Sequence, residues 1–141
     1  HTTHPTRDAL VLTSFPGWKD LREHPQFALD SLQDLKSSVS AVRSLGTAAL
    51  ELAYVAAGWA DAAMLSRIAP WDVAAGYHLV IQAGGTLRTW SGRPGETAEN
   101  SDVPPQLRPA YVACTGKDRI DILDTIQQAI HERRGRQGDT E

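Results

Sequence analysis

The chain has 141 residues and a mass of 15.3 kDa, a size that predicts one globular domain whose core needs no disulfide or structural metal. Its composition, 41% hydrophobic, 22% charged and 6% aromatic, excludes fibrous and intrinsically disordered chains. The 14 basic and 17 acidic side chains give a net charge of −3, which argues against a nucleic-acid partner.

The single cysteine and the lengths of the apolar runs are informative about cellular location and membrane association. Cys114 has no second cysteine with which to pair, as is usual in a reducing cytoplasm, so we expect a cytoplasmic location. Apolar runs in the sequence stay shorter than the ~18 residues that a membrane span requires. We therefore expect no membrane partner.

The first part of the chain predicts strands and helices in alternation. Residues 1–8 are polar and contain a proline, so they are expected to form an extended lead-in. Residues 10–12 predict a short buried strand, and residues 18–35 predict a helix interrupted by its proline. Residues 39–45 alternate in the manner of a strand and run into a predicted helix at 48–58, built almost wholly from small and apolar side chains.

The same alternation continues after residue 60. Residues 61–68 predict an extended segment, and residues 73–83 predict a second apolar helix that two consecutive glycines close. Residues 86–90 predict a strand. Residues 91–109 are rich in proline, glycine and polar side chains, which predicts an irregular loop.

The C-terminal part completes the pattern. Residues 111–114 predict a buried strand, and residues 118 to about 133 predict an amphipathic helix whose evenly spaced aspartates, Asp124 among them, face solvent. Residues 135–141 are expected to be a frayed tail. Strands that alternate with helices predict a layered α/β fold, a mixed sheet flanked by helices, as one domain over residues 9–134.

Two predicted helices begin with polar groups at a place where unpaired backbone N–H groups favour anions. The first start is Gly46-Thr47-Ala48. Gly46 permits close backbone approach, and the Thr47 hydroxyl can donate to a phosphate or sugar oxygen. The alternative is that Thr47 only caps the helix.

The second start is Pro70-Trp71-Asp72. A carboxylate in the first helical turn is most often a partner of the helix dipole, worth ~0.3–1 kcal/mol. The alternative is ligation of Mg²⁺, an ion that proteins commonly hold through one or two carboxylates together with substrate phosphate. Spacing alone leaves both open.

The sequence resembles a known family in these same motifs. The run VRSLGTAALELAYVAAGWADA, followed by PWDVAAGYHLVIQAGG, resembles the C-terminal half of the inositol monophosphatase family of Mg²⁺-dependent, lithium-sensitive phosphatases. The segments LVLTSFPGW and YVACTGKDRIDILDTI are similar to the opening of that half and to its last strand and helix. The resemblance implies the fold of that half.

The resemblance also implies roles for individual residues. Asp72 would be a ligand of a catalytic Mg²⁺ ion, and Gly46, Thr47 and Ala48 would line the site for a phosphorylated small-molecule substrate. A metal-activated water would attack phosphorus. Family members are often homodimers, which implies a homodimer here, with Met64 and Leu65 as contact residues if they are exposed.

The sequence departs from the family in two places. The other metal ligands of the family lie in an N-terminal half with an Asp-Pro-x-Asp-Gly-Thr motif, and this sequence contains no Asp-Pro or Asp-Gly pair. Since one carboxylate cannot hold two Mg²⁺ ions, we expect this chain alone to be inactive and to need the N-terminal half of the same enzyme. The rival hypothesis is a non-catalytic binding or assembly domain that retains the phosphatase scaffold.

The second departure concerns the substrate. Inositol-specific members carry an acidic residue seven positions before the aspartate of the WD motif, and Leu65 stands at that position relative to Asp72. The resemblance therefore implies a substrate-binding position at Leu65 without the carboxylate. We expect a phosphate ester other than myo-inositol 1-phosphate: another sugar phosphate, a nucleotide 3′-phosphate or an amino-alcohol phosphate.

Overall fold

A computed structural model of the protein describes residues 6–66, 73–90, 110–116 and 120–140, with residues 133–140 described by their backbone only. In chain order the elements are η1 (Thr6–Asp8), β1 (Leu10–Leu12), α1 (Trp18–Glu23), α2 (Pro25–Ser38), β2 (Ala41–Arg43), α3 (Ala48–Ala57), β3 (Ala62–Leu65), α4 (Ala74–Gln82), β4 (Thr86–Trp90), β5 (Ala110–Cys114) and α5 (Asp121–Thr140).

The strands form one mixed sheet in the order β2-β1-β3-β5-β4. β1 is the centre of a parallel group, because it pairs with β2 on one side and with β3 on the other, both in parallel. β5 runs antiparallel to β3 and to β4. The predicted layered α/β fold with a mixed sheet is therefore confirmed.

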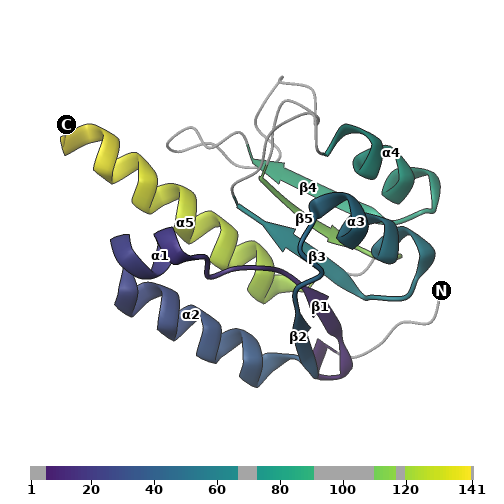
Figure 1. Cartoon of the computed structure of the whole chain (residues 1–141), viewed down its shortest axis with the longest axis horizontal. Helices are drawn as coiled ribbons and strands as arrows, with labels where there is room; N and C mark the ends of the chain where they lie inside the picture. Colours follow the sequence, from purple (N-terminus) through teal and green to yellow (C-terminus); the bar gives the residue numbers. More distant parts are fainter. Residues whose placement is uncertain (1–5, 67–72, 91–109, 117–119, 141) are drawn as a thin grey trace.

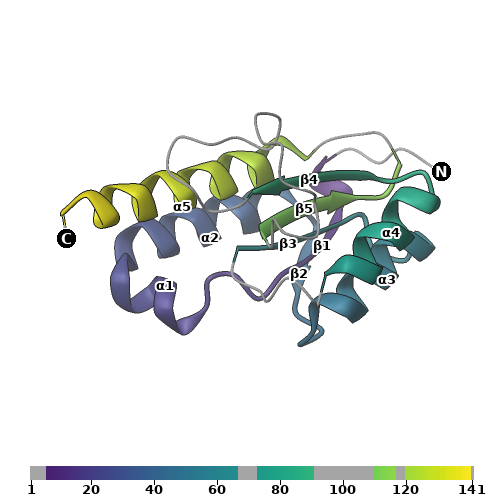
Figure 2. The ribbon, with the colours of Figure 1, turned by 90° about the horizontal axis from the view of Figure 1, so that it is seen from above.

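Helices cover both faces of this sheet. Figures 1 and 2 show α1, α2 and α5 on one side and α3 with α4 on the other. Strand residues alternate between the two layers, as the two-residue period of a strand requires: Val11 and Met64 belong to the core under α2 and α5, whereas Leu12 and Ala63 belong to the core under α3 and α4.

Local sequence signals explain where the helices begin and end. Pro25 is the first residue of α2, where a missing N–H costs nothing, so the predicted break separates α1 from α2. Thr47 caps the start of α3, and Gly58 ends it in the left-handed conformation at φ 79°. Apart from that break, the predicted boundaries of these helices hold to within a few residues.

Three predictions of local structure are wrong. Thr6–Asp8, expected to belong to an extended lead-in, forms the 3₁₀ helix η1. β2 is shorter than 39–45 because Val39 caps the end of α2 and donates its N–H to the Leu35 carbonyl. α5 continues through Thr140, where the sequence predicted a tail from residue 135. The glycines in that stretch lower helix propensity by about 1 kcal/mol each but, unlike proline, keep the N–H that the helix needs.

Among the residues that the structure describes, no helix combines the length and the apolar character that crossing a bilayer would take.

Candidate functional site at the carboxyl edge of the parallel strands

The chain leaves the parallel strands at one edge and in two directions. From β1 it turns to the face of α1 and α2, whereas from β2 it turns to the face of α3, on the opposite side of the sheet (Figure 2). α4, which follows β3, lies on the same face as α3. In open α/β sheets this divergence opens a crevice at the carboxyl ends of the strands, where ligands bind.

The turn that follows β2 forms one side of this edge. Gly46 has φ 89°, and a Cβ added there would meet nothing within 4 Å, so the turn is open on its outer side. The Thr47 Oγ1 accepts the N–H of Leu50 at 3.1 Å. Thr47 therefore caps α3 as the simpler alternative predicted, and its hydroxyl still has a proton to donate.

The first turn of α3 presents backbone donors at the same edge. In an α-helix the first N–H groups have no acceptor within the helix, and Thr47 takes only that of Leu50. The N–H groups of Ala48 and Ala49 remain available for an anion, and the helix dipole favours one there.

A buried carboxylate holds this turn in place. Glu51 is 1% exposed, and its Oε2 accepts the N–H of Leu45 at 2.9 Å. Burial raises the pKa of Glu51 above its usual 4.5, and the bond from Leu45 opposes that rise. The other oxygen, Oε1, is buried without a hydrogen-bond partner among the described residues. Glu51 thus fixes the backbone N–H of Leu45, the residue immediately before Gly46.

A pocket of about 180 Å³ lies between the ends of β1 and β3. Ser14, Phe15 and Trp18 line it from the segment that follows β1, and Leu65 and Ser66 line it from β3 and the residue after it. Next to these lining residues in the chain, the Thr13 hydroxyl donates to the Met64 carbonyl at 2.6 Å and accepts the N–H of Phe15 at 3.1 Å. The first of these bonds joins the residue after β1 to β3.

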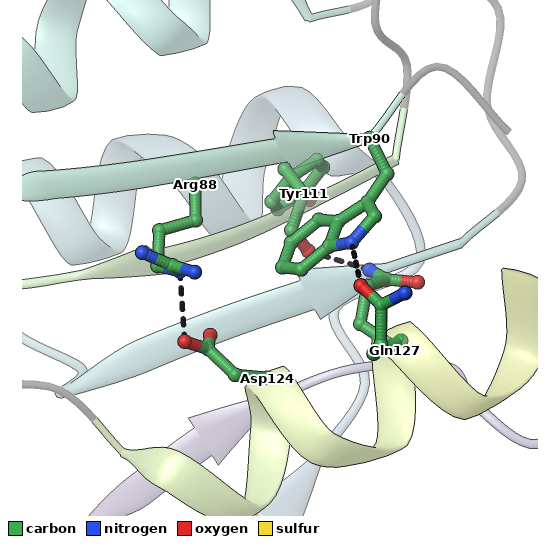
Figure 3. Close-up of polar contacts among 6 residues, drawn as sticks. Arg88, Trp90, Tyr111, Asp124 and Gln127 are labelled. Carbon is green, nitrogen blue, oxygen red and sulfur yellow. Dashed lines mark hydrogen bonds and ion pairs between the residues drawn. The ribbon is translucent and has the colours of Figure 1, made fainter. Parts of the chain in front are cut away.

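Helix α5 supports the end of β3 from the other layer. The Gln127 side chain is fully buried, and its Nε2 donates to the carbonyl oxygens of Leu65 at 2.8 Å and Tyr111 at 3.0 Å. Its Oε1 lies 3.2 Å from His131 Nε2. Figure 3 shows Gln127 reaching from α5 toward Tyr111. One side chain therefore fixes the carbonyl of the residue that lines the pocket.

Contacts beside Gln127 fasten α5 to β4. Arg88 Nε and Asp124 Oδ2 form an ion pair at 2.7 Å (Figure 3). Trp90 Nε1 donates to Gln128 Oε1 at 3.0 Å. The prediction that Asp124 faces solvent is wrong, because this carboxylate is about four-fifths buried against Arg88. The spacing of the aspartates alone could not show that a cation lies opposite one of them.

The structure brings several of the predicted site residues to one edge. Gly46, Thr47 and Ala48 form the start of α3, and Leu65 is the last residue of β3 and lines the pocket. Met64 is fully buried and cannot serve in the expected dimer contact. Asp72 lies outside the described residues.

Sequence reasoning missed three groups at the site. Glu51 stood out as the one charge in an apolar helix, and that signal could have marked it as a buried anchor. Trp18 and Gln127 carried no such signal, because their roles come from the strand order and from the packing of α5. In the described part of the chain, no three histidine, cysteine, aspartate or glutamate side chains gather as a metal cluster.

Comparison with known proteins agrees with the fold and with the family that the sequence resembles. The model of the inositol monophosphatase family matches residues 1–132. The chain is 50% identical over 72 residues to an inositol-1-monophosphatase of Bacillus subtilis, with 51% of this chain and 27% of that protein covered. It is 42% identical over 101 residues to a fructose-1,6-bisphosphatase/inositol-1-monophosphatase of Thermotoga maritima, with 72% and 36% covered.

A solved structure supports the same conclusion. The extragenic suppressor protein suhB of Bartonella henselae superposes with a TM-score of 0.62 at 28% identity, covering 96% of this chain and 44% of that one. The chain thus spans between about a quarter and a half of the length of these relatives. Because the family model matches nearly the whole chain, the protein belongs to the inositol monophosphatase family.

Proposed function

We propose that the chain is the C-terminal part of a phosphomonoesterase that hydrolyses inositol monophosphate or a related sugar or small-molecule phosphate. The observation that carries this proposal is the meeting of two features at one sheet edge: the anion-favouring start of α3 and the pocket between β1 and β3. The first suits a phosphate, and the second suits the alcohol to which that phosphate is esterified.

The residues of this chain bind and orient the ester in the proposal. The N–H groups of Ala48 and Ala49 hold phosphate oxygens, and the Thr47 hydroxyl donates a further hydrogen bond while it continues to cap the helix. Glu51 keeps the turn in the conformation that exposes these donors. Leu65 contacts the alcohol through the pocket.

Mg²⁺ belongs to the proposal through Asp72, together with the lithium sensitivity that the resemblance implies. The ion would supply an activated water and would neutralise charge on the phosphate. The described residues of this chain do not by themselves form a metal cluster. Carboxylates of an N-terminal half would have to complete its coordination, which makes that half a required partner.

The remaining expectations stand as parts of this proposal: a homodimer, a cytoplasmic location, and a substrate other than myo-inositol 1-phosphate. The last follows from the aliphatic side chain at Leu65, since an alkyl group cannot accept a hydrogen bond from a ring hydroxyl.

Phosphate release by the full-length protein tests the proposal. With Mg²⁺ and a panel of sugar, nucleotide and amino-alcohol phosphates, we expect turnover that Asp72→Asn abolishes and lithium inhibits. The 141-residue chain alone should release no phosphate. A full-length protein that is inactive on the whole panel would refute the proposal. In that case, partner binding that survives Asp72→Asn would support the scaffold hypothesis.

A further inference from the structure

The carboxyl group of Glu51 is buried in the first turn of α3 with only part of its hydrogen-bonding capacity used. The side chain is 1% exposed, and its Oε2 accepts the N–H of Leu45 at 2.9 Å. Its Oε1 is buried without a hydrogen-bond partner among the described residues. A neutral carboxyl group in this place lacks one hydrogen bond, whereas a carboxylate would be a buried charge without compensation, which costs far more. The geometry therefore favours the neutral form.

The side chains around Glu51 supply no compensating charge in the part of the chain that the structure describes. α3 packs against α4, β3 and β5. In this layer α4 contributes the phenol of Tyr77 and β5 that of Tyr111, whereas His78 of α4 is exposed and β3 has no titratable side chain. The Tyr111 hydroxyl is itself buried without a partner. Burial raises the pKa of Tyr111 above its usual 10, and the charge of Glu51 adds to that rise, so this neighbour stays neutral.

The same helical turn is the place that favours an anion. The free N–H groups of Ala48 and Ala49 lie at the start of α3, and Glu51 follows in the same turn. One turn of an α-helix rises by about 5.4 Å. Two negative charges at such a separation repel each other, and more strongly in a partly buried site than in water. Protonation of Glu51 removes this repulsion and leaves the bond from Leu45 in place, because a neutral carboxyl group still has an acceptor oxygen.

We infer that the binding of a dianion at the start of α3 is coupled to the uptake of one proton by Glu51. The neutral carboxyl group holds the turn through Leu45 and admits the anion, whereas the carboxylate repels it. Because coupling between two binding events is reciprocal, a bound anion also raises the proton affinity of Glu51. The inference rests on the proposed function, since it concerns the phosphate-binding part of that same site. Glu51 is a positioning residue whose charge sets the pH range of binding.

Sulfate binding to the protein tests the inference. Sulfate keeps two negative charges between pH 4 and 9, so its own titration cannot imitate the effect, as that of phosphate would. Isothermal calorimetry at constant ionic strength measures its affinity, and the amide NMR signals of Ala48 and Ala49 locate the site. We expect the affinity to be greatest at low pH and to fall by up to about ten-fold per pH unit as the pH rises through the pKa of Glu51. Buffers of different ionisation enthalpy should reveal the uptake of up to one proton per sulfate.

Three variants separate the charge of Glu51 from its role in holding the turn. Glu51→Gln keeps an oxygen for the N–H of Leu45 but cannot ionise, so its sulfate affinity should not change with pH and no proton should be taken up. Glu51→Ala loses the bond as well, so sulfate should bind more weakly at low pH than to the wild type. Asp61→Asn is the matched control. The Asp61 Oδ2 accepts the N–H of Leu10 at 2.7 Å where β1 begins, at the opposite edge of the sheet, so this variant should keep the pH dependence of the wild type.

The possible outcomes distinguish this inference from the proposed function. Equal pH dependence in the wild type and Glu51→Gln, binding without proton uptake, or no effect of sulfate on the Ala48 and Ala49 signals would overturn the inference. Hydrolysis of phosphate esters by the full-length protein is measured separately, and turnover there would leave the proposed function standing. Proton-linked sulfate binding by a protein whose full-length form hydrolyses no ester would instead support the inference and refute the proposed function.

Discussion

The close contact between α3 and α4 at Gly76 predicts how the Gly76→Ala substitution changes stability. A Cβ added to Gly76 would lie 2.5 Å from Leu52 Cδ1, 2.9 Å from its Cβ and 3.2 Å from its Cγ. Leu52 is fully buried, so it has little room in which to move. The tip of a leucine can rotate, but its Cβ moves only with the helix backbone. Restoring an ordinary carbon contact requires α3 and α4 to separate by roughly half an ångström.

The expected magnitude follows from two opposing terms. Alanine is a better helix former than glycine by about 1 kcal/mol, and overpacking of a close-packed core costs about 1–3 kcal/mol. We expect Gly76→Ala to lower the free energy of unfolding by about 1 kcal/mol. Ala75, the exposed neighbour on the same helix, is the matched control, because there glycine should be less stable than alanine by about 1 kcal/mol.

A double-mutant cycle isolates the contact. Leu52→Ala alone should cost about 2–5 kcal/mol by leaving a cavity. With Gly76→Ala in addition, the new methyl enters that cavity, so the double variant should be more stable than the sum of the single effects by at least about 0.5 kcal/mol. Urea unfolding followed by circular dichroism measures each variant. Additive effects, or a Gly76→Ala protein more stable than the wild type, would refute the steric reasoning.

Three further predictions concern polar groups. Burial raises the pKa of Glu51 above 4.5, so the contribution of this carboxyl group to the free energy of unfolding is fully present below pH 4.5 and is lost as pH rises through the raised pKa. Glu51→Gln should therefore flatten the pH dependence of the free energy of unfolding, measured by urea titration between pH 4 and 8. An unchanged pH dependence in this variant would contradict the assignment. Thr47→Ala should cost about 1 kcal/mol of unfolding free energy, whereas Thr47→Ser, which keeps the cap, should cost little. Burial raises the pKa of Cys114 to about 11, so a disulfide reagent at pH 8 should modify one thiol rapidly in urea and slowly in the native protein.

The sequence predicted the elements better than their boundaries. The run of small and apolar side chains and the Thr47 and Gly58 signals locate α3 almost to the residue, because these signals act within the helix itself. The start of β2 depends instead on competition between neighbouring hydrogen-bond networks, and the length of α5 depends on helix propagation through glycine. Those effects involve no apolar pattern, so the pattern could not report them.

At the candidate site, too, local features could be predicted from the sequence, whereas contacts between distant segments could not. The motif around Gly46 was visible in the sequence, since a glycine with positive φ and a capping threonine are local features. The pocket was not visible, because it exists only where β1 and β3 become neighbours despite the 49 residues between Leu12 and Ala62. No local rule connects Trp18 with Leu65.

Helix α5 contributes to the site although it is far from Leu65 in the sequence. The Gln127 amide donates to the carbonyls of Leu65 and Tyr111, which face each other at the end of the β3–β5 ladder. A buried amide group costs free energy unless its donors and acceptor are satisfied, and here His131 lies within reach of the remaining oxygen. The position of Leu65 is therefore set from two layers at once, by Thr13 next to Met64 on the β1 side and by Gln127 on the α5 side. Moving this pocket wall away from Gln127 would stretch and finally break buried hydrogen bonds, so the fit of a ligand against Leu65 depends on packing 62 residues away in the chain.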